Sequence, residues 1–149
     1  MKLVRFGKKN DEKPGFIDPE GGMRDLSDYF SDFTHKGVSL ETFDKIKNID
    51  YKKLPKVPRT TRLGSCLADT PNFYCIGLNY AKHAKETNAE IPKEPIVFSK
   101  ATSSISGPND QVVIPKGSIK TDWEVELGVI IGKHCQHVSE KDALSVVSG

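Results

Sequence analysis

The chain has 149 residues, of which 36% are hydrophobic and 28% are charged, and Lys and Arg outnumber Asp and Glu by 22 to 20. A net charge of +2 gives no reason to expect a nucleic-acid partner, because recognition of a phosphate backbone needs a clustered basic surface. This length accommodates one domain with its own core, or a small domain together with part of another.

The sequence gives no sign of a membrane or secreted protein. No apolar run approaches the roughly 20 residues that cross a bilayer, and residues 1–6 turn polar at once, without the apolar core of a signal peptide. The three cysteines are odd in number and lack a CxxC spacing, which is typical of reduced thiols. We therefore expect a cytoplasmic protein with no membrane partner.

The first part of the chain predicts a small α+β unit. Residues 2–6 alternate between polar and apolar and indicate a strand, and residues 15–17 indicate a second short strand. Ser39 is placed to begin a helix over residues 40–49, whose apolar side chains recur at helical spacing. The basic, proline-containing stretch at residues 51–62 is interpreted as a solvated linker.

The second part predicts more strands and little helix. Strands are expected at residues 73–78, 96–98, 112–114 and 122–132, a short helix at 80–87 and a final helix capped by residues 139–142. Many short strands, few helices and turns rich in Gly and Pro predict an α+β, mainly β fold. We expect a small N-terminal domain and linker over residues 1–69, followed by a second domain over residues 70–149.

Two glutamates define a candidate metal site on the strongest predicted strand. Glu124 and Glu126 stand two residues apart, and alternate residues of a strand point to the same face. Two neighbouring carboxylates repel each other unless a cation lies between them, and hard oxygen ligands suit Mg²⁺, Mn²⁺ or Ca²⁺. The alternative is an ordinary solvated polar face of a half-exposed strand.

Three further residues are candidates for chemistry. His83 and Glu86 are three residues apart on the short predicted helix and share a face, so the carboxylate can orient the imidazole for proton transfer. Lys100 follows a predicted strand and is placed to bind a substrate carboxylate. The alternatives are a surface pair and an exposed loop lysine. No dinucleotide fingerprint, Walker-type phosphate loop or GxSxG nucleophile motif is present in the sequence.

Four blocks in order carry a family resemblance: IGLNYAKH at 76–83, EPIVFSK at 94–100, GP at 107–108 and DWEVELGVIIGK at 122–133. This series resembles the fumarylacetoacetate hydrolase (FAH) family, and the stretch at 100–133 is most similar to bacterial members named ureidoglycolate lyase or oxo-acid hydrolase. The resemblance implies a small N-terminal domain followed by the first part of the mixed β-roll of that family.

The resemblance also implies roles for the candidate residues. Glu124 and Glu126 match the paired metal-binding glutamates, His83 and Glu86 match the water-activating His-x-x-Glu of a mobile lid helix, and Lys100 matches a lysine facing the bound oxo-acid. Such an enzyme is a hydrolase or lyase that uses Mg²⁺ or Mn²⁺ to stabilise the enolate left by C–C bond cleavage, and its full-length form is a homodimer.

The resemblance covers only part of the family's catalytic domain. Family members are longer, and their third carboxylate ligand lies beyond the residue that aligns with Gly149. We therefore expect this chain to be inactive or weakly active by itself. The alternative function is that of a non-catalytic remnant, or of a half-domain that needs a partner chain. The sequence does not specify the substrate within the family.

Overall fold

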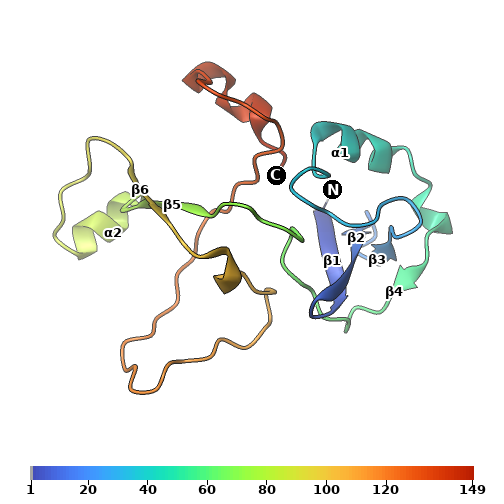
Figure 1. Cartoon of the computed structure of the whole chain (residues 1–149), viewed down its shortest axis with the longest axis horizontal. Coiled ribbons are helices and arrows are strands. Elements are labelled where there is room, and N and C mark those ends of the chain that lie inside the picture. The colour runs from blue at the N-terminus through green and yellow to red at the C-terminus, as the bar shows by residue number, and fades with distance from the viewer. Residues whose placement is uncertain (1) are drawn as a thin grey trace. The chain divides into compact units, whose positions relative to one another are not determined.

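The computed structural model describes residues 2–149 and divides the chain into two compact units (Figure 1). The first unit comprises Met1–Asp69 together with Ser106–Gly149, and the second comprises Thr70–Ile105. The predicted domains at residues 1–69 and 70–149 stay a prediction. Among the described residues, no helix combines the length and the apolar character that a membrane crossing requires.

The first unit is built on a four-stranded antiparallel sheet in the order β1-β2-β3-β4. Its strands are β1 (Lys2–Lys8), β2 (Asp11–Ile17), β3 (Met23–Asp25) and β4 (Lys56–Val57). The turn between β1 and β2 places Asn10 at a φ of 68°, a left-handed conformation that Asn adopts more readily than most residues. Gly15 is required in β2, because a Cβ there would meet the Arg24 carbonyl oxygen at 2.6 Å.

The sequence predicted the first two strands correctly and the linker only in part. Both predicted strands are present, and each is longer than expected. Within the stretch interpreted as a linker, Tyr51–Lys53 forms a 3-10 helix and β4 pairs with β3. Local composition missed β4 because a strand of two residues is defined by its pairing with Met23 and Arg24, which lie far away in the sequence.

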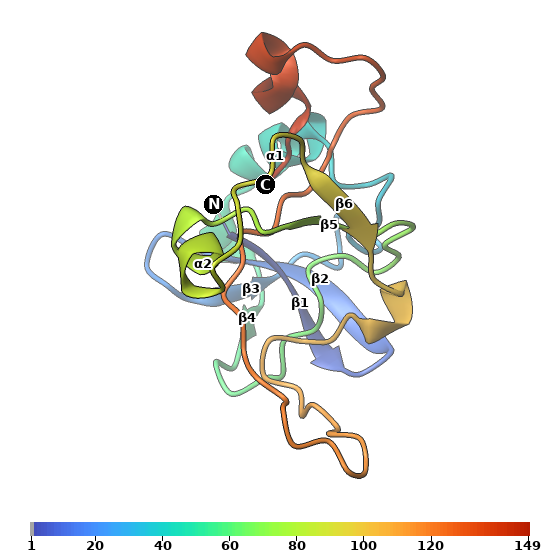
Figure 2. The ribbon, with the colours of Figure 1, turned by 90° about the vertical axis from the view of Figure 1, so that its left-hand side faces the viewer.

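Helix α1 (Leu40–Lys47) lies beside this sheet in both ribbon views (Figure 1, Figure 2). The helix begins where it was predicted, and the Ser39 hydroxyl accepts a hydrogen bond from the backbone N–H of Thr42, which satisfies one of the unpaired donors of the first turn. The buried core comprises Phe16, Leu26, Phe33, Val38, Ile46, Leu54 and Leu67. Ile130 packs against this core from the C-terminal part of the chain.

The second unit contains a two-stranded antiparallel sheet and one short helix. Strand β5 (Tyr74–Gly77) pairs with β6 (Ile96–Ser99), and α2 (Ala81–Glu86) lies between them in the sequence. All three elements were predicted. Together with the first unit they confirm an α+β, mainly β fold. The final helix is also present, as the 3-10 helix Glu140–Val146, and the Ser139 hydroxyl accepts a hydrogen bond from the Asp142 N–H at its start.

Two predicted strands do not form in the described structure. Residues 112–114 and 122–132 contain no strand, apart from a single bridge between Ile131 and Val147. The side chains of these segments alternate as a strand requires, but a strand also needs a neighbour that pairs with its backbone N–H and C=O groups. Within residues 2–149 that neighbour is present only for residues 130–132, which pair with residues 146–149.

A chain of ion pairs holds the segment that follows residue 106 against the first sheet. The Arg62 guanidinium donates to both carboxylate oxygens of Asp110 at 2.7 Å and to Glu12 at 2.8 Å. Glu12 also contacts Arg5 at 3.5 Å, and Arg5 donates to both oxygens of Asp32 at 2.7 and 2.8 Å. Because the Arg62–Asp110 pair is bidentate, it restrains orientation as well as distance.

These contacts shift the acid–base properties of the linked groups. Hydrogen bonds from Arg62 and from the backbone N–H of Gly107 lower the pKa of Asp110 to about 2. The pKa of Glu12 is also lowered, because the effect of burial, which raises it, is outweighed by Arg62, the local backbone and Arg5. The pKa of Arg62 is raised by its hydrogen bonds to Asp110 and Glu12. These contacts therefore favour the charged form of both carboxylates.

We predict that Asp110→Asn lowers the melting temperature at pH 7 by a few degrees, because it removes the charged partner of Arg62. The native pKa of Asp110, about 2, lies below its usual value of 3.8, so its contribution is present above pH 3.8 and is lost as the pH falls towards 2. The difference in melting temperature between the unchanged chain and the Asp110→Asn variant should therefore decrease as the pH falls over that range. Asp44→Asn serves as the control, because the exposed Asp44–Lys47 pair contributes little. An equal gap at pH 7 and pH 2.5 would contradict the prediction.

Candidate functional site

The predicted lid helix α2 is short and loosely held within its unit. Ala84 is its only buried residue, so few apolar contacts fix it. It is flanked by two residues in the left-handed region, Leu78 at a φ of 51° and Asn88 at 53°. Leucine adopts this conformation at a cost in free energy, which makes the exit from β5 a strained point. These features are those expected of a helix that moves as a lid.

His83 and Glu86 lie on one face of α2, as their spacing predicted. The Nδ1 atom of His83 is 3.9 Å from the Oε2 atom of Glu86, which is an ion-pair distance but is too long for a hydrogen bond. Both side chains are exposed. This arrangement allows the carboxylate to orient the imidazole once a substrate or a water molecule draws the pair together.

Lys100 lies in the same unit, directly after β6. Its backbone N–H donates to the carbonyl oxygen of Phe73 at 3.0 Å, and this bond extends the pairing of β5 with β6 by one step. The side chain is exposed. The position of Lys100 is therefore set by the sheet, while its ammonium group remains available to an anionic ligand.

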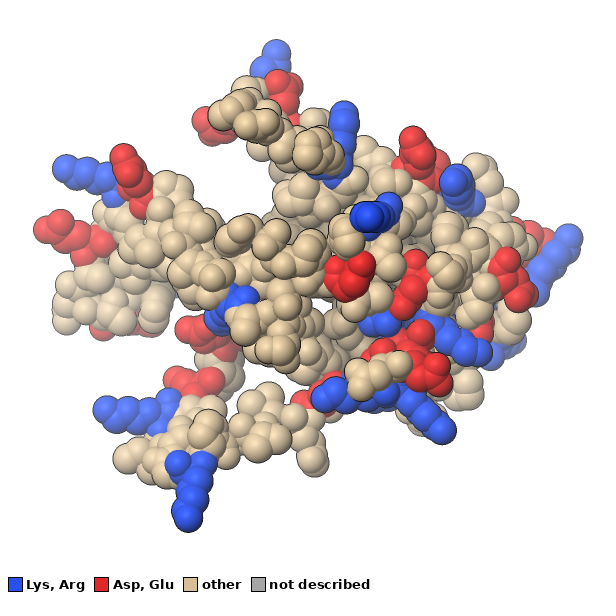
Figure 3. Space-filling model, viewed as in Figure 1, with Lys and Arg blue, Asp and Glu red and all other residues tan. Residues whose placement is uncertain are grey.

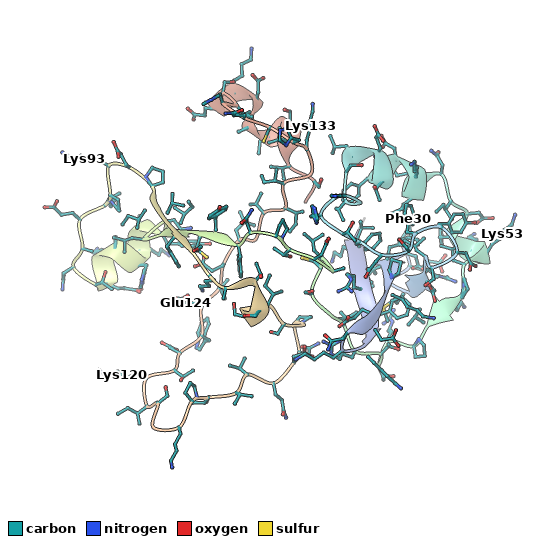
Figure 4. The ribbon with its side chains drawn as sticks, in the orientation of Figure 1. Phe30, Lys53, Lys93, Lys120, Glu124 and Lys133 are labelled. Carbon is teal, nitrogen blue, oxygen red and sulfur yellow. The ribbon has the colours of Figure 1, made fainter. Side chains whose placement is uncertain are left out.

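Glu124 and Glu126 lie in the first unit, on the extended segment that follows Asp110. Figure 4 shows Glu124 on this segment, where the ribbon has neither strand nor helix. Both glutamates are exposed, and among the described residues neither side chain has a hydrogen bond or a salt bridge. Every residue from 111 to 129 is exposed. The strand that was expected to hold the two carboxylates on one face is not formed here, so their shared orientation stays a prediction.

The donor chemistry of the two glutamates suits a hard divalent cation, although they supply only two side-chain ligands. Carboxylate oxygens are the ligands that Mg²⁺ and Mn²⁺ prefer, and Mg²⁺ commonly retains several waters beside one or two carboxylates. No group of three His, Cys, Asp or Glu side chains within residues 2–149 is close enough to hold a metal ion. Any metal bound through Glu124 and Glu126 would therefore take its remaining ligands from water, substrate or further protein groups.

A hollow of about 260 Å³ lies on the first sheet, and none of the five candidate residues lines it. It is lined by Asp18, Glu20, Gly22, Met23, Arg24, Lys56, Val57 and Arg59. The buried Arg24 donates to Asp18 at 2.6 Å, so these two charges are already paired with each other. On the face drawn in Figure 3, acidic and basic side chains are interspersed.

Comparison with known proteins places this fold among hydrolases. The family described as "Fumarylacetoacetate (FAA) hydrolase C-terminal" matches residues 72–149. A protein of Burkholderia ambifaria (strain MC40-6), provisionally named a hydrolase, is 50% identical over 149 residues, which are 100% of this chain and 53% of that protein. A protein of Burkholderia multivorans with a similar provisional name is 49% identical over the same span. The chain thus spans about half the length of the curated relatives it matches.

Two solved structures share the fold. A provisionally named HpcE protein from Mycobacterium smegmatis superposes with a TM-score of 0.78 at 27% identity, over 99% of this chain and 52% of that one. Fumarylacetoacetate hydrolase from Exiguobacterium antarcticum gives a TM-score of 0.73 at 28% identity, again over 99% of this chain and 52% of the other.

These matches show that the chain has the hydrolase fold of its structural neighbours. Because the family match covers more than half of the residues, the chain belongs to the fumarylacetoacetate hydrolase family. All five candidate residues, from His83 to Glu126, fall inside the matched region. The family resemblance recognised in the sequence is confirmed.

The sequence did not reveal the anchor formed by Asp110. Asp110 lies in a Gly-Pro-Asn-Asp turn, where a carboxylate favours local hydrogen bonds, and it accepts the Gly107 N–H at 2.9 Å. The same carboxylate also binds Arg62, which is 48 residues away. Gly107 itself must be a glycine, since a Cβ there would collide with the Leu63 carbonyl oxygen. No local sequence signal identifies a partner at such a distance.

We predict that backbone amides of residues 124–129 exchange with deuterium at nearly the unprotected rate, because none of them has a backbone acceptor among the described residues. The amides that β1 and β2 donate to each other in their seven-residue ladder should be protected. Hydrogen exchange followed by mass spectrometry measures both regions in one experiment. Strong protection of residues 124–129 in the isolated monomer would show that their backbone is already paired.

Proposed function

We propose that this chain provides the paired metal-binding glutamates and the lid of a divalent-metal-dependent enzyme that acts on small 2-oxo acids or related carboxylates. The observation that carries the proposal is the match of residues 72–149 to the fumarylacetoacetate hydrolase family, which includes all five candidate residues. The provisional hydrolase names of the Burkholderia relatives agree with hydrolytic chemistry.

The proposed roles follow from the chemistry of each side chain. Glu124 and Glu126 would hold Mg²⁺ or Mn²⁺, which supplies charge stabilisation for an enolate when it is bound. Lys100 is a point charge on a flexible stem and would bind the substrate carboxylate. His83 would accept a proton from water, while Glu86 holds its imidazole in the productive orientation. Closure of α2 would exclude bulk water from these groups.

We predict that the 149-residue chain by itself binds Mg²⁺ weakly. Two carboxylates leave most of the octahedral shell to water, and Mg²⁺ binds poorly to such open sites. Calorimetric titration should show weak binding that is reduced further by Glu124→Gln or Glu126→Gln. Glu140→Gln, which changes an exposed glutamate in the final 3-10 helix, should leave the binding unchanged. Tight binding, or equal loss in all three variants, would contradict this metal-site proposal.

The catalytic roles can be tested in a chimera in which this chain replaces the matching 149 residues of the Burkholderia ambifaria relative. We expect metal-dependent turnover of acylpyruvates, oxaloacetate or ureidoglycolate. His83→Ala should lower kcat by about 10²- to 10⁴-fold, the range typical of a general acid–base. Lys82→Ala, also on α2, is the control and should leave kcat nearly unchanged.

The chimera also distinguishes the two functions considered for this chain. A folded chimera that binds metal but shows no activity on any of these substrates would favour a non-catalytic remnant. An active chimera whose activity is insensitive to His83→Ala would keep the metal-dependent enzyme and remove the proposed role of His83.

A further inference from the structure

The hollow on the first sheet carries more positive than negative charge. Its charged lining residues are three cations, Arg24, Lys56 and Arg59, and two carboxylates, Asp18 and Glu20. A concave surface with an excess of one charge raises the local concentration of ligands of the opposite charge. The hollow can bind an anion in this way only if its surplus cations lack acidic partners within the protein.

The carboxylate of Asp18 is fully used by neighbouring groups. Its Oδ1 atom accepts the backbone N–H of Glu20 at 2.9 Å and that of Gly22 at 2.7 Å, and its Oδ2 atom accepts the Nε–H of Arg24 at 2.6 Å. The side chain of Asp18 has no exposed surface. Asp18 therefore neutralises one cation and has no capacity left for the other two, or for a metal ion.

Arg24 is held in place with one nitrogen left over. Its guanidinium carbon lies 5.8 Å from the centre of the Tyr51 ring, and its Nη1 donates to the Leu54 carbonyl oxygen at 3.4 Å. Its Nη2 makes no hydrogen bond to any described residue. Since no buried side-chain nitrogen or oxygen within residues 2–149 lacks a partner, Nη2 must be reached by solvent. Arg24 thus offers a preorganised donor at a residue that lines the hollow.

Lys56 and Arg59 supply the unmatched charge. Lys56 lies directly opposite Arg24 in the pairing of β3 with β4, a position at which like charges destabilise the strand pair. Arg59 donates to a backbone carbonyl oxygen at 2.9 Å, which is a neutral acceptor. Both side chains are exposed, and neither has a salt bridge to a described residue. The remaining carboxylate, Glu20, accepts the hydroxyl of Tyr51 at 3.2 Å.

We propose that this hollow is a binding site for a small organic anion, which it holds by a carboxylate or phosphate group. Lys56 contributes a mobile point charge, Arg59 a planar fork of donors and Arg24 its open Nη2, and hydrogen bonds between ionised groups are stronger than neutral ones. Met23 and Val57 also line the hollow and would contact a short carbon skeleton. The site contains none of the five candidate residues, so it stands independently of the proposed function.

The site can be tested by titrating the ¹⁵N-labelled chain with succinate and, separately, with inorganic phosphate. Ionic strength is held constant by lowering the chloride concentration, because screening changes the attraction between exposed charges. We expect saturable shifts of the amide resonances of residues 20–24 and 56–59, while the resonances of β1 remain in place. The anion that saturates at the lower concentration identifies which of the two groups the hollow prefers.

Variants separate a specific site from general attraction to positive charge. Lys56→Gln and Arg59→Gln should each weaken binding about tenfold, because each removes a charge-assisted hydrogen bond, whereas Lys56→Arg keeps the charge and should retain binding. Lys53→Gln is the control, since the exposed Lys53 (Figure 4) lies three residues before Lys56 and does not line the hollow. Unchanged β1 and β2 resonances show that each variant is folded.

Three results would overturn the proposal. The first is that neither anion produces saturable shifts. The second is that the shifts centre on residues outside the hollow. The third is that Lys53→Gln weakens binding as much as Lys56→Gln does, which would show that the anions respond only to net charge.

Discussion

The backbone of an extended segment must find hydrogen-bond partners, and this requirement governs the region that carries the candidate metal ligands. Residues 122–129 have the alternation of a strand and lack a neighbour among the described residues, so they remain extended and exposed. Glu124 and Glu126 therefore have the spacing of residues on one face of a strand, but they are not part of a strand in this structure. A metal site that depends on the direction of two side chains needs a fixed backbone, so the proposed site requires these residues to be paired as a strand.

What the described residues do provide is a firm base for that segment. The ion pairs among Arg62, Asp110, Glu12 and Arg5 attach the chain after residue 106 to the first sheet, and Ile130 returns it to the core. A bidentate guanidinium–carboxylate contact restrains direction better than a single hydrogen bond. Glu124 and Glu126 thus lie between two fixed points of the first unit, the Arg62–Asp110 contact and Ile130. Helix α2, the proposed lid, belongs to the second unit, and Ala84 is its only buried residue.

Local patterns predicted the elements whose signals are local, and they failed where a distant partner decides. The cap at Ser39 and the spacing of apolar residues predicted α1. Local sequence also predicted β5, α2 and β6. Strand β4 was missed because its identity comes from pairing with β3. The strand predicted at residues 122–132 does not form for the same reason. The alternation of apolar and polar side chains indicates which face is apolar, but it does not show whether a neighbouring strand is present. For the site, the sequence identified the family and the candidate residues, of which Glu124 and Glu126 belong to the first unit and the other three to the second.

The central claim is that Glu124 and Glu126 hold a divalent cation once the strand that carries them is paired. The most direct measurement uses Mn²⁺ as a paramagnetic probe in the ¹⁵N-labelled chimera in which this chain replaces the matching 149 residues of the Burkholderia ambifaria relative. At substoichiometric Mn²⁺, we expect selective broadening of the amide resonances of residues 122–128, which is abolished in the double variant Glu124→Gln/Glu126→Gln. Broadening centred elsewhere, for instance around Asp18 and Glu20, or broadening that persists in the double variant, would contradict the claim.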